Sequence, residues 1–256
     1  MSVASLAARL RTGEALISGW SSLADPVVAE IVGRQGFDCV VLDMQHGLHD
    51  IGTVGRCLAS LTLAGKPTIV RVPLGDSASA SRALDLGAAA VIAPMVNSAA
   101  EARAFVAATK YPPVGERSWG PTRALTLHGI AGPAYLDAAN TETLTIVMIE
   151  TARALAAIAE ILVVPGIDGV FVGPHDLSVT MSAGKSVAPA DPALDKALGT
   201  IVTAAAGAGK FACIYAPTAE RARRYRELGY QLIAVGSDAG YLAAGATEVL
   251  AAIRRT

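Results

Sequence analysis

The stretch Val40-Val41-Leu42-Asp43-Met44-Gln45-His46-Gly47 decides the fold, because a buried strand ends there in polar side chains. The run 39–42 is short, apolar and rich in valine, which is typical of a parallel strand covered on both faces. Asp43, Gln45 and His46 follow at its C-terminal end. The pattern predicts that this strand delivers polar groups to one edge of a parallel sheet.

Three later apolar runs end in the same way. In a barrel of parallel strands the C-terminal ends converge on one mouth, so the groups that follow these runs are expected to meet there. The runs and their following groups are Ile69-Val70 with Arg71, 145–149 with Glu150, and 169–172 with Gly173-Pro174-His175-Asp176.

Apolar runs alternate with helical patterns along the whole chain, which predicts an α/β protein. The 256 residues suit one (β/α)8 TIM barrel, as a single domain over 1–256. An open doubly wound sheet is the alternative, but no GxGxxG or Walker A motif follows any expected strand. The expected strands are 16–20, 39–42, 67–72, 89–94, 145–150, 169–172, 211–215 and 232–235.

Segment 111–140 breaks this alternation with a series of prolines and glycines. We expect a long irregular insertion here, and such insertions in compact domains are usually functional. After the last strand, Gly236-Ser237-Asp238 occupies a place where barrels can bind phosphate, although a plain helix cap is favoured because Asp238 would repel an anion.

Composition excludes several classes of function. Hydrophobic residues make up 52% of the chain and charged residues 17%, which predicts a large core and not a disordered protein. The net charge of -1 gives no case for binding nucleic acid or an acidic membrane.

No apolar run approaches the roughly 20 residues of a membrane span. Arg9 and Arg11 interrupt the N-terminal apolar stretch, so no signal peptide is expected. Three isolated cysteines indicate a reducing, cytoplasmic location.

Glu150 and Asp176 end consecutive expected strands, so their carboxylates are predicted to meet over the barrel mouth. Carboxylate oxygens favour Mg²⁺ or Mn²⁺, with Co²⁺ or Zn²⁺ as alternatives. Two carboxylates leave coordination positions for water and a chelating substrate. The alternative interpretation is that both residues belong to helix starts, with Asp176 capping a helix from Leu177.

Arg71 and His46 are the other candidates for chemistry. A strand-end guanidinium needs a carboxylate or an anionic ligand. Arg71 is therefore a candidate to stabilise an enolate or bind a carboxylate, and the alternative is a structural ion pair with Asp43 or Glu150; the two roles are compatible. His46, on a glycine-flanked turn, is a candidate general acid or base. Asp85 is a candidate to orient it. His49 and His128 are interpreted as ordinary loop residues.

With these residues in view, the chain resembles the metal-dependent (class II) pyruvate aldolases of the hydroxyketoacid (HpcH/HpaI) aldolase family, which is related to the citrate lyase beta subunit. The resemblance covers nearly the whole chain. Five motifs carry it in the right order and at strand ends: Leu42-Asp43-Met44-Gln45-His46-Gly47, Val70-Arg71-Val72-Pro73, Ala93-Pro94-Met95-Val96, Met148-Ile149-Glu150-Thr151 and Gly173-Pro174-His175-Asp176-Leu177-Ser178.

The resemblance implies a hexamer of barrels whose C-terminal helices are exchanged between neighbours. It implies that Glu150 and Asp176 ligate a divalent metal, which pyruvate chelates through its carboxylate and keto oxygens. Arg71 would stabilise the enolate oxygen, and His46, oriented by Asp85, would act as acid and base with a metal-bound water. The residues implied to hold the pyruvate unit are Gln45 and the backbone of Gly173, Pro174, His175 and Asp176.

This resemblance predicts reversible cleavage of a 4-hydroxy-2-oxo acid into pyruvate and an aldehyde, within the catabolism of aromatic or sugar acids. No lysine is expected at a C-terminal strand end, which argues against a Schiff-base aldolase. One alternative is an acyl-CoA lyase of the same fold, acting on malyl- or citramalyl-CoA. No Lys/Arg cluster follows the relevant strands to bind the CoA phosphates. The other alternative is a non-catalytic barrel that serves assembly only.

The chain departs from the family pattern at two places. Gln45 stands where members often carry Glu, and Ser118 stands where many carry Gly. Ser118 belongs to the stretch 115–124, which resembles the family's acceptor-side loop. Arg123 in this stretch either meets an acid group on the acceptor or is a solvated loop arginine.

Overall fold

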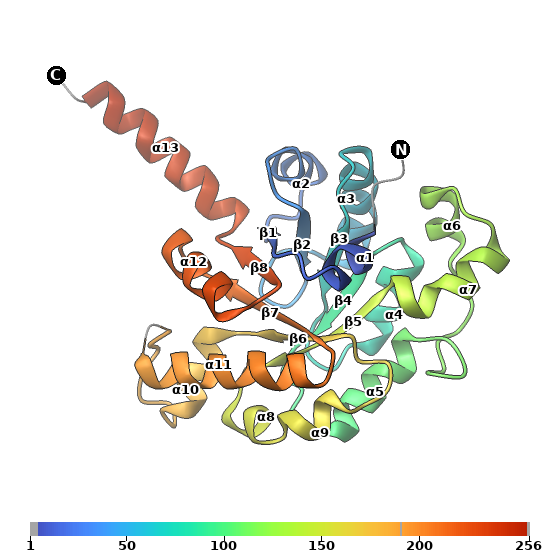
Figure 1. Cartoon of the computed structure of the whole chain (residues 1–256). Helices are drawn as coiled ribbons and strands as arrows, with labels where there is room; N and C mark the ends of the chain where they lie inside the picture. The colour runs from blue at the N-terminus through green and yellow to red at the C-terminus, as the bar shows by residue number, and fades with distance from the viewer. Residues whose placement is uncertain (1–4, 190, 255–256) are drawn as a thin grey trace.

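The computed structural model describes residues 5–189 and 191–254. Eight parallel strands pair in chain order, and β8 pairs back with β1 to close the barrel (Figure 1). The predicted (β/α)8 barrel is therefore confirmed. The strands are β1 Leu16–Ser21, β2 Cys39–Asp43, β3 Thr68–Arg71, β4 Ala90–Ala93, β5 Leu144–Ile149, β6 Gly169–Val172, β7 Phe211–Ala216 and β8 Leu232–Val235.

Helices surround the barrel and connect its strands (Figure 1). Several begin at side-chain caps that the sequence supplies, such as Asp25 before α2 and Asp50 before α3. The helices are α1 Leu6–Arg11, α2 Pro26–Gly33, α3 Ile51–Leu63, α4 Ser77–Asp85, α5 Ala99–Thr109, α6 Thr122–His128, α7 Gly132–Glu142, α8 Ala152–Ala156, α9 Ile158–Leu162, α10 Pro174–Met181, α11 Pro192–Gly207, α12 Ala219–Leu228 and α13 Asp238–Arg254.

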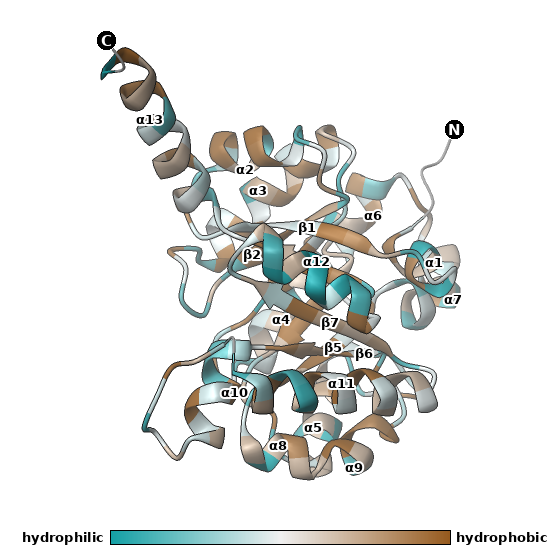
Figure 2. Cartoon of the chain, turned by 60° about the vertical axis from the view of Figure 1, so that its left-hand side comes forward, coloured by the Kyte–Doolittle hydropathy of each residue, from teal (hydrophilic) through white to brown (hydrophobic). Residues whose placement is uncertain are grey.

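The strands are buried on both faces of the sheet, which explains why their sequences are continuous apolar runs. In β2, Val41 joins a cluster inside the barrel, while Val40 and Leu42 join a second cluster between the barrel and the helices. Helix α1 adds Leu6 and Leu10 to the inner cluster, so it closes the barrel at the N-terminal end. Figure 2 shows the result: brown strands inside, and teal on the outward helix α12.

Segment 111–140 is less irregular than the sequence predicts, because it contains α6 and most of α7. Before it, α5 carries the chain back from the end of β4, and after it β5 begins. The Lys110 ammonium fixes this return by binding the Thr143 carbonyl at 2.6 Å and Asp168 at 2.7 Å, just before β5 and β6 start. The segment therefore lies at the N-terminal end of the barrel, opposite the mouth.

Other element boundaries differ from the predictions in small ways. Residues 152–162 form two short helices, α8 and α9, and α10 begins at Pro174 instead of the expected Leu177. The alternation of strands and helices also predicts a helix over 2–11. This helix begins at Leu6 with Ser5 as its N-cap, and residues 1–4 lie outside the described part. Cys39 and Cys213 are buried in strands, as predicted, and both are free thiols.

Helix α13 projects away from the barrel (Figures 1 and 2). Only Asp238, at its start, is buried. Three of its large apolar side chains are mostly exposed: Leu242 at 59%, Val249 at 60% and Ile253 at 70%. Within the described part of the chain, no helix combines the length and apolar character needed to cross a membrane. These three side chains are thus left largely uncovered by the described residues of this single chain.

Candidate active site

Asp43 and Arg71 form the first half of the site at the mouth of the barrel. They end the neighbouring strands β2 and β3 and are partners in the strand register. Arg71 Nε donates to Asp43 Oδ1 at 2.8 Å, and Arg71 Nη2 donates to Asp43 Oδ2 at 2.6 Å. The guanidinium also lies over the Trp20 ring, 4.8 Å from its centroid. The predicted ion pair with Asp43 is therefore present.

This pair is buried and oriented by further donors. Burial opposes ionisation of Asp43, but the Arg71 guanidinium and the N–H groups of Gln45 and His46 lower its pKa below the usual value. Nε and Nη2 of Arg71 donate to Asp43, which leaves Nη1 available to donate to a ligand. Arg71 also lines the mouth cavity. A structural ion pair and an anion-binding role are thus compatible in one side chain.

Glu150 forms the second half of the site. Glu150 directly follows β5 in the chain and is only 1% exposed. Its Oε1 accepts the Met95 N–H at 2.7 Å, and Oε2 faces Gly173 so closely that a Cβ there would lie 2.5 Å from it. Burial raises the pKa of Glu150 to about 7; Met95 and Arg71 oppose this shift, and Asp176 adds to it.

Asp176 and His175 lie in the first turn of α10, which begins directly after β6. Asp176 is exposed and makes no capping hydrogen bond, so the capping interpretation is wrong for this residue. It lines a mouth cavity of about 280 Å³ together with His46 and Arg71. The other residues of this cavity are Trp20, Ser22, Asp43, Met148, Phe171, Gly173, Pro174, His175, Tyr215 and Ser237.

His46 is exposed at this cavity, as its position on a glycine-flanked turn predicts. Gln45 differs, because it does not line the cavity. Its backbone N–H donates to Asp43 Oδ1 at 3.0 Å, while its buried side-chain oxygen has no hydrogen-bond partner among the described residues. Within the described chain, Gln45 therefore supports Asp43, and its contact with substrate stays a prediction.

Asp85 does not lie beside His46 in this chain. It ends α4, which has carried the chain to the N-terminal end of the barrel. There Asp85 Oδ1 accepts a 2.7 Å hydrogen bond from Arg117, whose guanidinium is buried against the Tyr111 ring. The predicted orientation of His46 by Asp85 thus has no basis within a single subunit, because a helix length separates the two side chains.

The stretch that resembles an acceptor-side loop is also at the N-terminal end of this chain. Arg123 is exposed in the first turn of α6, and Ser118 precedes that helix near the buried Arg117. Neither residue lines the mouth cavity of its own subunit. Arg123 therefore matches the solvated interpretation within one chain.

One buried polar network at the mouth was missed by sequence reasoning. The Ser21 hydroxyl lies 3.0 Å from His49 Nε2 and donates to Asp238 Oδ2 at 3.0 Å. Asp238 also accepts N–H groups of Ser22 and Leu23, so it anchors the end of β1 instead of repelling a bound phosphate. Burial lowers the pKa of His49, although the neighbouring carboxylates oppose the shift.

This network is not a nucleophilic triad, because Asp238 binds the serine and not the histidine. The only sequence signal for this network was Asp238, a polar residue just after β8. His49 lies in a loop whose sequence has no distinguishing pattern. Tyr215 and Phe171 also line the cavity, and sequence reasoning missed them. Their strands are apolar along their whole length, so the sequence does not indicate which side chains face the cavity.

The donor set at the mouth fits a hard divalent cation. Glu150 is a buried carboxylate that ionises with difficulty in the absence of a positive charge, and its Oε2 accepts no hydrogen bond from the described residues. Asp176 is close enough to influence it. The described residues hold no cluster of three or more His, Cys, Asp or Glu side chains suited to a metal. Two carboxylates with open positions are the arrangement that a chelating substrate requires.

A closed parallel barrel that gathers an arginine and two carboxylates at the C-terminal ends of its strands has the architecture of the (β/α)8 enzymes, whose active sites lie at this end. Residues 17–244 match the family model of HpcH/HpaI aldolase/citrate lyase. The chain belongs to this family, as its motifs predict.

Named relatives and solved structures agree. The chain is 37% identical to the hydroxypyruvate/pyruvate aldolase of Roseovarius nubinhibens, over 94% of this chain and 93% of that protein. It is 39% identical to the 4-hydroxy-2-oxo-heptane-1,7-dioate aldolase of Salmonella arizonae, over 95% and 91%. An HpcH/HpaI aldolase from Desulfitobacterium hafniense superposes with a TM-score of 0.90, at 25% identity over 99% of this chain and 98% of that one. These relatives favour the predicted aldolase over the acyl-CoA lyase.

Proposed function

We propose that this chain is a divalent-metal-dependent aldolase that reversibly cleaves a 4-hydroxy-2-oxo acid into pyruvate and an aldehyde. The observation that carries this proposal is the buried Glu150, whose pKa is raised to about 7 and whose Oε2 lies against Gly173. Gly173 lines the mouth cavity together with Arg71 and Asp176. Such a site concentrates one unpaired buried carboxylate and one guanidinium where a 2-oxo acid would bind. The aldolase names of the relatives support it.

The proposed metal ligands are Glu150 and Asp176, with Mg²⁺ or Mn²⁺ as the favoured ions. When bound, the metal supplies Lewis acidity that stabilises negative charge developing on the keto oxygen of pyruvate. Arg71 supplies a second, fixed positive charge, held in place by Asp43 before substrate arrives. Backbone groups at the start of α10, from Gly173 to Asp176, would hold the pyruvate carboxylate.

His46 is the proposed acid and base, since it is an exposed histidine on the same cavity. An orienting role for Asp85 requires a second subunit, because Asp85 of the same chain lies at the opposite end of the barrel. The proposed hexamer with exchanged C-terminal helices would provide neighbours. The exposed apolar side chains of α13, and those of Val27 and Ile31 on α2, support such an exchange.

The cytoplasmic location and a role in the catabolism of aromatic or sugar acids accompany this proposal. The buried free thiols of Cys39, Cys57 and Cys213 support a reducing compartment.

The direct test is aldol cleavage measured by pyruvate release, coupled to lactate dehydrogenase. Several 4-hydroxy-2-oxo acids of differing tail length would be assayed after chelator treatment and again after adding Mg²⁺ or Mn²⁺. We expect cleavage only with metal and only when Glu150 is present. Full activity of Glu150→Gln, or full activity in excess chelator, would contradict the proposal. Cleavage of malyl-CoA in place of these acids would favour the acyl-CoA lyase.

A further inference from the structure

The turn 94–97 after β4 places a backbone N–H against the proposed metal ligand. Met95, in this turn, has φ of +56°, a left-handed conformation that non-glycine residues seldom adopt. Its N–H donates to Glu150 Oε1 at 2.7 Å. Unusual backbone of this kind persists only where the surroundings hold it, so the contacts of the turn are informative.

Asn97 supplies those contacts. Its Nδ2 donates to the Met95 carbonyl at 2.6 Å, and its Oδ1 accepts the Thr151 hydroxyl. Thr151 directly follows Glu150 and caps α8 through Ala154 N–H at 2.9 Å. One amide side chain therefore joins the loop that carries Met95 to the loop that carries Glu150.

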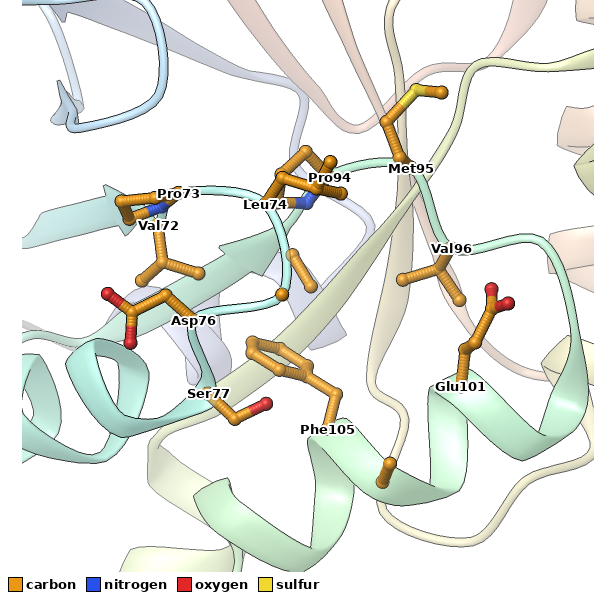
Figure 3. A pocket seen from close by; sticks show the side chains of 13 residues that line it. Val72, Pro73, Leu74, Asp76, Ser77, Pro94, Met95, Val96, Glu101 and Phe105 are labelled. Carbon is orange, nitrogen blue, oxygen red and sulfur yellow. The ribbon is translucent and has the colours of Figure 1, made fainter.

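A backbone hydrogen bond to α5 also holds this turn in place. Glu101 accepts the Asn97 N–H at 2.5 Å, while Ser98 performs the capping of α5. The Asn97 side chain is thus not needed for the helix cap. Figure 3 shows the turn at the border of a cavity of about 320 Å³, with Met95 pointing away from Phe105 and Val96 pointing toward it.

We propose that Asn97 is a positioning residue for Glu150, and that it sets the affinity of the site for its divalent metal through the Met95 backbone. This inference rests on the proposed function. Fixing Oε1 to the Met95 N–H leaves Oε2 pointing in one direction beside Gly173. A carboxylate ligand that is already oriented loses less rotamer freedom when a cation binds, which is why outer hydrogen bonds affect metal affinity.

The chain offers a matched control at the other end of the barrel. Like Asn97, the Asn140 side chain makes two hydrogen bonds, here both to backbone: it accepts Tyr111 N–H at 2.8 Å and donates to the Tyr111 carbonyl at 2.9 Å. Asn140→Ala and Asn97→Ala therefore delete similar structural contacts, but only Asn97 touches the loop that holds the metal ligand.

The experiment is a titration of chelator-treated protein with Mn²⁺, in which free Mn²⁺ is measured by electron paramagnetic resonance. We expect Asn97→Ala to raise the Kd by about tenfold or more, and Asn140→Ala to leave it at the wild-type value. Asn97→Ser is the second variant, for use if Asn97→Ala does not fold. Its shorter side chain stays polar but cannot join the Met95 carbonyl to the Thr151 hydroxyl as Asn97 does, so it is expected to bind Mn²⁺ more weakly than wild type.

The outcomes separate the two proposals. An unchanged Kd in the folded Asn97→Ala protein, or in Asn97→Ser if that variant is used, overturns the positioning role. An equal loss of affinity in Asn140→Ala also overturns it, because the effect would then follow from general destabilisation. If wild type binds no Mn²⁺, or Glu150→Gln binds it equally well, the proposed metal site itself fails and the positioning role fails with it.

Discussion

Replacing Glu150 with glutamine should stabilise the metal-free protein while abolishing its activity. Burial raises the pKa of Glu150 from 4.5 to about 7, so the folded protein must ionise this carboxyl at neutral pH against an unfavourable free energy. At 1.36 kcal/mol for each pKa unit, the shift corresponds to about 3 kcal/mol of folding free energy. Glutamine keeps an oxygen for the Met95 N–H and removes the charge.

The sign of the pH dependence follows from this shift. The unfolded chain ionises Glu150 above about 4.5 and the folded chain only above about 7, so the destabilisation grows through that interval. We expect urea unfolding at pH 8, in chelator and at fixed protein concentration, to show Glu150→Gln more stable than wild type by up to about 3 kcal/mol. The difference should shrink toward zero as the pH falls to 4.5.

Added Mn²⁺ provides the internal control. It should stabilise wild type at pH 8 and leave Glu150→Gln nearly unchanged, because binding to the folded state raises stability by mass action. A variant that is less stable than wild type at pH 8 in chelator would refute the reasoning. So would a stability difference that does not vary with pH, since the burial of a charge would then not be its cause.

Three further variants test separate parts of the site. Arg71→Lys keeps a charge but loses the paired hydrogen bonds to Asp43, so the cleavage kcat should fall by about 10²-fold; an unchanged kcat contradicts this. Gly173→Ala places a Cβ 2.5 Å from Glu150 Oε2, and calorimetric titration should show weakened Mn²⁺ binding; wild-type affinity would show that the loop yields. Asp238→Asn weakens the anchor of β1, and urea unfolding should show a loss of about 1–3 kcal/mol; no loss would mean that the anchor is dispensable.

The barrel was predictable from sequence because parallel strands covered on both faces have to be continuous apolar runs. The predicted limits of β6 and β8 match the structure, and the other strands differ by one residue at one or both ends. The same rule located Arg71, Glu150 and Asp176, since each lies at or just after the end of a strand and the strand ends share one mouth.

Segment 111–140 shows where this reasoning fails. Its prolines and glycines predict loop, but Gly129 serves as the left-handed cap of α6 and Pro133 lies in the first turn of α7. The glycine that ends α6 and the proline that begins α7 are thus among the residues that made the segment look irregular. Only the return of α5 and the contacts of Lys110 place the segment away from the mouth.

The pairings of side chains were the least predictable feature. Sequence suggested Asp85 for His46, but α4 takes Asp85 to the far end of the barrel, where Arg117 binds it. His49 lies in a loop, as predicted, but the loop buries its ring against Ser21, which the sequence does not indicate. Such contacts join residues far apart in the chain, and neither periodicity nor spacing records which loops meet.

The most direct test of the account is exchange of the pyruvate methyl protons with D₂O, followed by NMR in chelator and after adding Mg²⁺. It requires no knowledge of the aldehyde, because enolisation of pyruvate is the step that the site is proposed to promote. The account predicts metal-dependent exchange above an enzyme-free control, and its disappearance in Arg71→Ala. Exchange no faster than the control in protein shown to bind the metal would contradict it.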